Sequence, residues 1–142
     1  MVAYSFKKQF GPPILAGTKA QTIRADRKRH ARPGEELQLY TGMRTKHCRL
    51  VARVPCIAVE PVRLVFSRRG PSELFEIAGT PLSPRKMIRF AHADGFDSLD
   101  AMNRCWWAEH PPEEGDTLDF TGVVICWTPL APADALDIGA AA

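Results

Sequence analysis

Short runs of strand-forming residues, each closed by glycine or proline, divide most of this 142-residue chain and limit what it can fold into. Residues 36–40 alternate polar and apolar side chains, as a strand with one buried face does. Comparable runs lie at residues 2–6, 22–24, 48–59, 62–66 and 115–127. Pro55 interrupts its run, which favours two short strands or one bulged edge strand there.

Helical signals are concentrated between the last two of these runs. Residues 84–93 carry apolar side chains at helical spacing, and Gly95 follows where a C-cap belongs. A second helix is expected after Ser98, a favourable N-cap, with Trp106 on its apolar face and Pro111 at its end. Many short strands with few helices predict an α+β, mainly β fold, namely a small β-barrel with flanking short helices.

The length of the chain fits one domain, which we expect over residues 1–128. Residues 129–142 are rich in Ala, Pro and Asp, and we expect a disordered C-terminal tail there. No apolar run approaches the roughly 18 residues that cross a bilayer, and the first ten residues lack the pattern of a secretory signal. We therefore expect a cytoplasmic protein without a membrane partner.

Two classes of site find no support in the sequence motifs. The four cysteines, at positions 48, 56, 105 and 126, form no CxxC pair, so a zinc site is not indicated and reduced thiols are expected. The glycine-rich phosphate-binding motifs and the HExxH motif are also missing from the sequence. These observations argue against nucleoside-triphosphate chemistry and against a zinc protease.

Charge is strongly segregated along the chain. Residues 1–53 hold 12 basic and 3 acidic residues, a net charge of +9, whereas residues 90–142 hold 1 and 10, a net charge of −9. Such asymmetry indicates a polyanion-binding face, although the two segments can also neutralise each other by packing together. The candidate nucleic-acid contacts are Lys19, Arg24, Arg27, Lys28, Arg29, Arg44 and Lys46.

A dense polar cluster follows the glycine at position 17. Lys19, Thr22 and Arg24 lie within six residues, and Thr22 and Arg24 share one face if residues 22–24 are extended. This set can form an anion cradle, in which Arg24 is a forked donor and Lys19 a point charge. It can also be catalytic, because a lysine held near another cation loses affinity for its proton and can then activate the Thr22 hydroxyl.

Three motifs resemble the ASCH domain family, a relative of the PUA RNA-binding domain, over roughly residues 3–127. They are Gly17-x-Lys19-x-x-Thr22-x-Arg24, then Pro33-Gly34-Glu35-x-Leu37-x-Leu39, then Ala91-x-x-Asp94-Gly95-Phe96. The resemblance implies a PUA-like β-barrel with a cleft that accepts RNA or a nucleoside. Family members are associated with RNA binding, with hydrolysis of N4-acetylcytidine and with metal-dependent ribonuclease activity.

For the amidohydrolases of the family, the resemblance assigns the catalytic Lys and Thr to Lys19 and Thr22. Their catalytic glutamate falls on Asp94, which is a departure from the family pattern. Asp is one methylene shorter than Glu, and a displacement of about 1 Å can cost about a hundredfold in rate. This departure makes the amidohydrolase the alternative interpretation.

For the ribonuclease-like members, the resemblance assigns a catalytic Tyr, Lys and small hydroxyl residue to Tyr40, Lys46 and Thr121. The family hydroxyl is a serine, so Thr121 adds a methyl group. Lys46 can neutralise a phosphorane, Tyr40 can stack on a base or donate a proton, and Thr121 can orient a phosphate oxygen.

The favoured prediction is an RNA-binding protein that acts as a metal-dependent ribonuclease on single-stranded RNA. The alternatives are a nucleoside amidohydrolase and an RNA-binding module without catalysis. A divalent metal ion is expected only for the ribonuclease, and Asp94, Asp97 and Asp100 are the nearest group of carboxylates.

Overall fold

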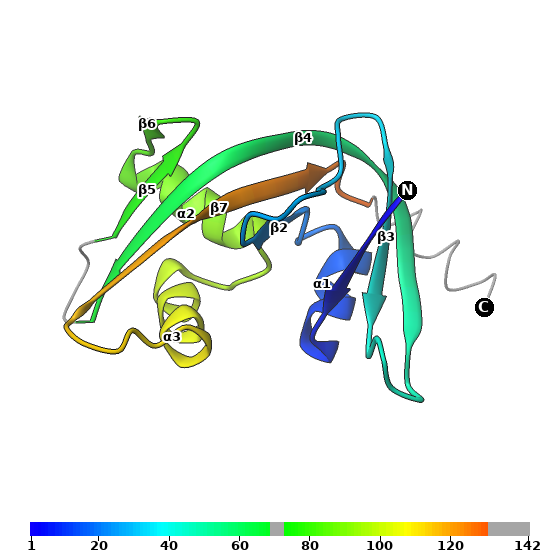
Figure 1. The fold of residues 1–142 in the computed structure, drawn as a ribbon, viewed down its shortest axis with the longest axis horizontal. Coiled ribbons are helices and arrows are strands. Elements are labelled where there is room, and N and C mark those ends of the chain that lie inside the picture. Colours follow the sequence, from blue (N-terminus) through cyan, green and yellow to red (C-terminus); the bar gives the residue numbers. More distant parts are fainter. Residues whose placement is uncertain (69–72, 131–142) are drawn as a thin grey trace.

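A computed structural model describes residues 1–68 and 73–130 of the chain (Figure 1). Most of the tail predicted over residues 129–142 lies outside the described residues. The elements, in chain order, are β1 (Val2–Phe6), η1 (Lys8–Phe10), α1 (Gly11–Ala16), β2 (Gln21–Arg24), β3 (Glu36–Thr41), β4 (Arg49–Ser67), β5 (Leu74–Ile77), β6 (Thr80–Pro81), α2 (Pro84–Ala93), α3 (Leu99–Glu109) and β7 (Thr117–Trp127).

Strand β4 spans 19 residues and joins the other strands into one sheet. Its first part pairs with β3 in antiparallel fashion, and its second part pairs with β7 on one side and with β5 on the other. Strand β1 lies parallel to β3, and β2 lies antiparallel to β7. Figure 1 shows β4 as an arch, with α1, α2 and α3 on its concave side.

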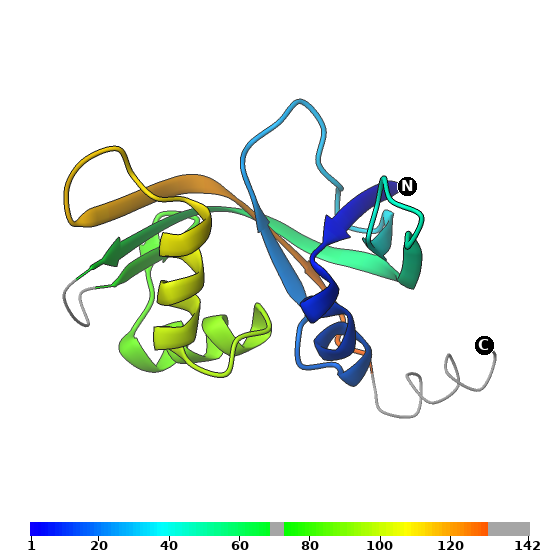
Figure 2. The same cartoon turned by 90° about the horizontal axis from the view of Figure 1, so that it is seen from below.

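The strands of the described residues form an open mixed sheet. Its order is β1-β3-β4-β5-β6, with β7 and then β2 branching from β4, and no ladder among these residues joins β2 to β1. The mainly β prediction is therefore confirmed, whereas closure into a barrel is not observed. In both views the β1–β3 end of the sheet and the β5–β7 end are separate blocks joined by β4 (Figures 1 and 2).

The runs predicted at residues 48–59 and 62–66 are one continuous strand. Over the stretch that contains Pro55, β4 pairs with β3 alone, so the proline leaves no ladder bond unmade on the opposite side. The register shifts between Cys56 and Ala58, where the strand bulges. A bulge increases local bending. This one lies between the part of β4 that pairs with β3 and the part that pairs with β7 and β5.

Two hydrophobic cores fill the two ends of the arch. The first core takes the inward residues of β1 and β3, which alternate buried and exposed, and adds Ile14 and Trp127. The second core packs Phe66 and Phe75 from the sheet against Phe90 and Trp106 from the helices. The helices α2 and α3 are thus held by aromatic contacts, among them Phe66 stacked on Trp106 at 5.5 Å between ring centroids.

The predicted helix boundaries agree with the structure. Ser98 accepts a hydrogen bond from the backbone N–H of Ala101 at 3.0 Å, and Ser83 caps α2 in the same way through Lys86 at 3.2 Å. α1 ends at Gly17, whose φ of 80° is the left-handed conformation expected of a glycine cap. Within residues 1–68 and 73–130, no helix has the length and apolar character needed to span a bilayer.

Candidate active site

The segment after α1 is fixed against the end of α2. The backbone N–H of Ala20 donates to the carbonyl of Ala93 at 2.8 Å, and Lys19 forms an isolated β-bridge with Asp94. Gly17 makes this path possible, since a Cβ atom there would lie 2.1 Å from the carbonyl oxygen of Leu130 and φ is positive. The polar cluster predicted at Lys19 is therefore joined to Asp94, 75 residues later in the chain.

An aromatic cavity of about 400 Å³ opens beside this junction. Phe6 and Phe10 come from one end of the arch, and Phe96, Trp106 and Phe120 come from the other. The rings contact one another edge to face, with centroids 5.8 Å apart for Phe10 and Phe96 and 4.9 Å apart for Trp106 and Phe120. The remaining lining residues are Ser5, Lys7, Thr22, Ile23, Arg24, Ala25, Asp94, Cys105, Glu109 and His110.

Asp94 lines the cavity and forms a buried pair with Lys19, which is not one of the lining residues. The side chains of Lys19 and Asp94 are 4% and 8% exposed, the Lys19 Nζ donates to the Asp94 backbone oxygen at 2.6 Å, and it lies 3.7 Å from Asp94 Oδ1. Gln21 Nε2 donates to the same carboxylate oxygen at 3.4 Å. The ammonium also faces the ring of Phe10, 4.8 Å from its centroid.

Burial acts on both members of this pair in opposite directions. It lowers the pKa of the Lys19 amine, which the Asp94 carboxylate opposes, and it raises the pKa of the Asp94 carboxyl, which Lys19 opposes. The positive charge of Arg24 further lowers the pKa of Lys19. Burial therefore disfavours the charged form of both groups, and their mutual attraction opposes that effect.

Arg24 orients the hydroxyl of Thr22. Its Nε donates to Thr22 Oγ1 at 2.9 Å, and its Nη2 donates to the backbone oxygen of Ser5 at 2.6 Å. The guanidinium also stacks over Tyr4 and Phe6, at 5.3 and 5.0 Å from the ring centroids. Because Thr22 is only 4% exposed and accepts from Arg24, its own O–H is free to donate to another group.

Tyr40, Lys46 and Thr121 are not brought together in the structure. Tyr40 lies at the end of β3, opposite Leu50, and its hydroxyl donates to Gln38 at 3.3 Å. Thr121 is exposed on β7 opposite Arg63, so the two pairing positions on β4 are 13 residues apart, about 40 Å along the strand. Lys46 is exposed in the turn between β3 and β4, near Tyr40 in sequence. The ribonuclease assignment therefore stays a prediction, because the sheet does not bring Thr121 close to Tyr40.

Some of the predicted basic contacts gather at a shallow cleft next to the aromatic cavity. Arg24, Arg27 and Arg44 line it together with Tyr4 and Ser5, and its volume is about 280 Å³. Ser5 and Arg24 also line the aromatic cavity, so the two are contiguous. We call this region the arginine cleft. Three other predicted contacts, Lys28, Arg29 and Lys46, are exposed outside it, and Arg29 pairs with Glu35 at 2.6 Å.

The alternative interpretation of the charge segregation is also realised in part. Lys7 of the basic segment pairs with Glu109 of the acidic one, and Lys19 pairs with Asp94. The cations of the arginine cleft behave differently, because neither Arg27 nor Arg44 has an ion pair with a described residue. The segregated charge therefore serves packing in one place and leaves a cationic surface in another.

No group of three His, Cys, Asp or Glu side chains suited to a metal ion is found within the described ranges. Of the three predicted carboxylates, Asp94 faces Lys19 and Asp100 pairs with Arg104 at 2.8 Å. The four cysteines are free, as expected.

Several residues beside the Lys19–Asp94 pair or in the cavity wall were not predicted as site residues. Gln21 has no motif that marks it, and its contact with Asp94 follows only from the pairing of distant segments. Trp106 was predicted as a core residue on an apolar helix face, and it is both 7% exposed and part of the cavity wall. An aromatic residue at the edge of a core looks the same in sequence as one at its centre.

Comparison of the chain with family models, with curated proteins and with solved structures finds no match.

Proposed function

We propose that the protein hydrolyses the amide bond of a small N-acylated heteroaromatic compound of the nucleoside type. The observation that carries this proposal is a group of polar side chains at one aromatic-walled cavity: Thr22, Arg24 and Asp94 line it, and Lys19, which does not line it, pairs with Asp94. A buried amine, an oriented hydroxyl and an adjacent carboxyl are the groups that acyl transfer to a threonine requires. Their resemblance to the ASCH amidohydrolase motif supports the same activity, and with it a PUA-like ancestry for the open sheet.

The walls of the cavity suit a flat ring. Phe10, Trp106 and Phe120 offer faces and edges on which a heteroaromatic base stacks, an interaction of about 1–3 kcal/mol per base. A volume of about 400 Å³ lies within the usual range for small-molecule sites. Glu109 and His110 at the rim add polar groups that can contact a ribose.

In the proposed reaction the neutral amine of Lys19 accepts the proton of the Thr22 hydroxyl. The Thr22 oxygen attacks the amide carbon, and the C–N bond breaks as Lys19 returns the proton to the leaving nitrogen. Water then cleaves the threonyl ester, releasing a carboxylic acid and restoring Thr22. A neutral amine can still donate an N–H to the Asp94 carbonyl oxygen while its lone pair serves as the base.

Asp94 serves this scheme through Lys19. It contacts the amine directly, with backbone and carboxylate oxygens both directed to Nζ, so an aspartate can hold the lysine where the family uses glutamate. The carboxylate holds the amine in position, while burial lowers the pKa of Lys19 and so favours its neutral form. The cost predicted for the shorter side chain applies only if the carboxyl must reach the substrate.

The test uses N4-acetylcytidine as the substrate and follows the release of cytidine and acetate by chromatography. Thr22→Val, which replaces the hydroxyl by a methyl group of similar volume, is expected to abolish turnover, and Thr22→Ser is expected to retain a measurable part of it. Lys46→Ala, outside the cavity, is the control and should react as the parent protein does. Full activity of the Thr22→Val protein rejects the proposal, as does the absence of turnover in the parent protein.

RNA binding is a second candidate, and the arginine cleft is the observation that favours it. Three arginines with few acidic neighbours, contiguous with a cavity that accepts a base, suit a single strand whose backbone lies outside the cavity. Affinity for a labelled single-stranded RNA should fall with salt, with a log-log slope of about −0.7 per phosphate contacted. An Arg27→Gln, Arg44→Gln protein should bind more weakly, and an affinity indifferent to salt rejects this candidate.

Cleavage of that RNA, the activity first predicted from Tyr40, Lys46 and Thr121, is tested in the same mixtures. A ribonuclease at these residues predicts that Lys46→Ala removes cleavage and that a chelator removes it in the parent protein. Retained cleavage by the Lys46→Ala protein rejects that assignment.

A further inference from the structure

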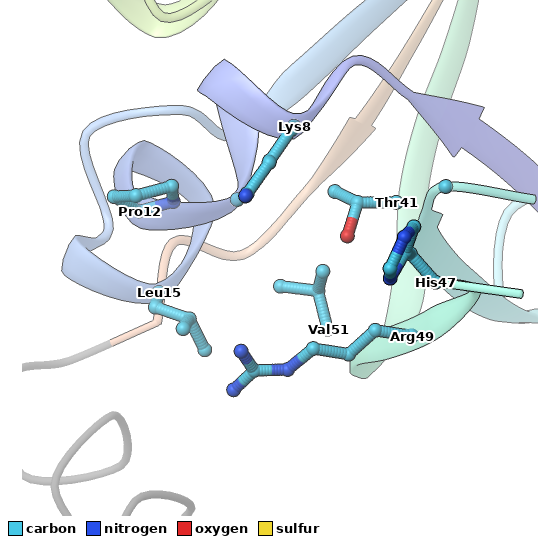
Figure 3. A pocket seen from close by; sticks show the side chains of 9 residues that line it. Lys8, Pro12, Leu15, Thr41, His47, Arg49 and Val51 are labelled. Atoms are coloured by element: carbon cyan, nitrogen blue, oxygen red, sulfur yellow. The ribbon is translucent and has the colours of Figure 1, made fainter.

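A second cavity, of about 390 Å³, lies between α1 and the β3–β4 turn (Figure 3). Its lining shares no residue with the aromatic cavity. We call it the cationic hollow, and its lining consists of Lys8, Gly11, Pro12, Leu15, Thr41, Gly42, His47, Arg49 and Val51.

The floor of the cationic hollow is apolar. Val51 is 6% exposed, and Leu15 and Pro12 of α1 face it across the hollow in Figure 3. Gly11 contributes its backbone, and a Cβ atom there would meet only the Thr41 methyl group, at 3.7 Å. Such a floor accepts a hydrocarbon group and excludes water from it.

The rim of the cationic hollow is basic and lacks a neutralising partner. Lys8 enters from η1 and Arg49 from β4, with His47 beside them (Figure 3). The lining contains no Asp or Glu, and neither Lys8 nor Arg49 forms an ion pair within the part of the chain that the structure describes. An arginine fork and a lysine at one opening are the donors that bind carboxylate and phosphate oxygens.

The side chain of Thr41 adds a hydrogen-bonding group to the cationic hollow. Thr41 is 8% exposed, and its hydroxyl has no hydrogen bond with any residue of the described ranges. In Figure 3 the hydroxyl oxygen points into the space that the lining side chains surround. A hydroxyl that faces the cavity without a protein partner is available to donate a hydrogen bond to a ligand there.

We propose that the cationic hollow binds a small organic anion with an apolar body. The carboxylate or phosphate group lies between Lys8 and Arg49 and accepts a hydrogen bond from Thr41, and the hydrocarbon part lies on Leu15 and Val51. This site is independent of the proposed hydrolysis, because it shares no residue with the aromatic cavity. The volume suits a ligand of metabolite size rather than a polymer.

The test is a binding titration with hexanoate and with hexyl phosphate, followed by calorimetry and by the backbone amide NMR signals of Thr41 and Val51. Hexanol lacks the anionic group, and inorganic phosphate lacks the apolar body. We expect saturable binding of hexanoate, hexyl phosphate or both at millimolar concentration or below, and at least about tenfold weaker binding of hexanol and of inorganic phosphate. Comparison of the two anions identifies which head group fits.

Two variants locate the site. Arg49→Gln should weaken binding at least about tenfold, the loss of one charge-assisted hydrogen bond, and Thr41→Val should weaken it without removing charge. Arg53→Gln is the matched control, because Arg53 lies on the same strand, pairs with Glu36 and does not line the cationic hollow. Absence of binding by both anions, equal binding of hexanol, or unchanged affinity of the Arg49→Gln protein overturns the proposal.

Discussion

The aromatic cavity and the cationic hollow hold their charges in opposite ways. In the aromatic cavity the charges of Lys19 and Asp94 are buried and face each other, whereas in the cationic hollow Lys8 and Arg49 are exposed and unopposed. Burial lowers the pKa of the Lys19 amine and raises the pKa of the Asp94 carboxyl, whereas exposed cations attract anions. The proposed hydrolysis and the proposed anion binding thus use charges held in opposite ways.

The largest effect expected from this contrast is on stability. Lys19→Met leaves the Asp94 carboxyl buried without its cation, and we expect a loss of about 3–5 kcal/mol in the free energy of unfolding. Arg49→Met removes an exposed cation without a partner and should change that free energy by less than about 0.5 kcal/mol. Urea unfolding of the two proteins gives the comparison. Equal stability of both variants would mean that the buried pair carries no more free energy than a surface charge.

A double substitution distinguishes the loss of the whole ion pair from the cost of leaving one buried charge without its partner. Lys19→Met with Asp94→Leu removes both buried groups, and we expect it to recover more than about half of the stability lost in Lys19→Met alone. The free energies of unfolding of the parent, the two single variants and the double variant complete the cycle. A double variant less stable than either single variant would show that packing rather than charge dominates at this position.

The next effect is on the pH dependence of hydrolysis. The proposed hydrolysis requires the neutral amine of Lys19, whose pKa is lowered from 10.5 by burial, so kcat/KM should rise with pH through a midpoint below 10.5. The sign follows because protonation removes the base, and a lowered pKa leaves more free amine near neutral pH. A pH–rate profile with N4-acetylcytidine measures it. A rate that falls as pH rises through this range would exclude Lys19 as the base.

A smaller effect is expected from salt, which should weaken anion binding in the cationic hollow more than it changes the rate of the proposed hydrolysis. Raising the ionic strength from about 0.05 to about 0.5 M shortens the Debye length, which is about 10 Å at 0.1 M, and should weaken hexanoate binding at Lys8 and Arg49 severalfold. The buried pair of the aromatic cavity is screened much less, so kcat should change by less than about twofold. The same salt response in both assays would remove the contrast.

The smallest effect expected concerns the cysteines near each cavity. Cys48 is exposed next to His47, whereas Cys105 lines the aromatic cavity and burial raises the pKa of its thiol. Burial raises the pKa of the Cys126 thiol to about 11, and Cys56 is buried in the first core. Iodoacetamide at neutral pH should therefore modify Cys48 first, and Cys56 and Cys126 after it, as read by peptide mass spectrometry. Modification of Cys56 or Cys126 before Cys48 would contradict this order.

Local chemistry made the regular elements predictable. The alternation in β3, the extent of α2 and the Ser98 cap of α3 each depend on residues close together in the chain, and the structure agrees with them. Strands β5 and β6 are short, at four and two residues, and no alternation marks them. The alternative of one bulged strand through Pro55 agrees with β4, but its continuation through residues 62–66 was not predicted, because the sequence does not tell which partner lies on each side of a strand.

Only those residues of the candidate site that belong to a sequence motif could be predicted. Lys19, Thr22 and Arg24 are neighbours in sequence, and Asp94 entered through the family resemblance rather than through spacing. Gln21 and the aromatic walls depend on contacts between distant segments, so no local pattern reveals them. The opposite error occurs at Tyr40 and Thr121. The resemblance placed them in one site, but the sheet holds them far apart.

The length of β4 has a consequence for the aromatic cavity. Phe6 is attached to the half of β4 that pairs with β3, and Phe120 is attached through β7 to the other half. The curvature of β4 therefore contributes to the spacing of these rings, together with β7 paired along it and the contact between Ala20 and the end of α2. We expect a substitution at the bulge beside Cys56 to change this spacing without touching any residue of the wall.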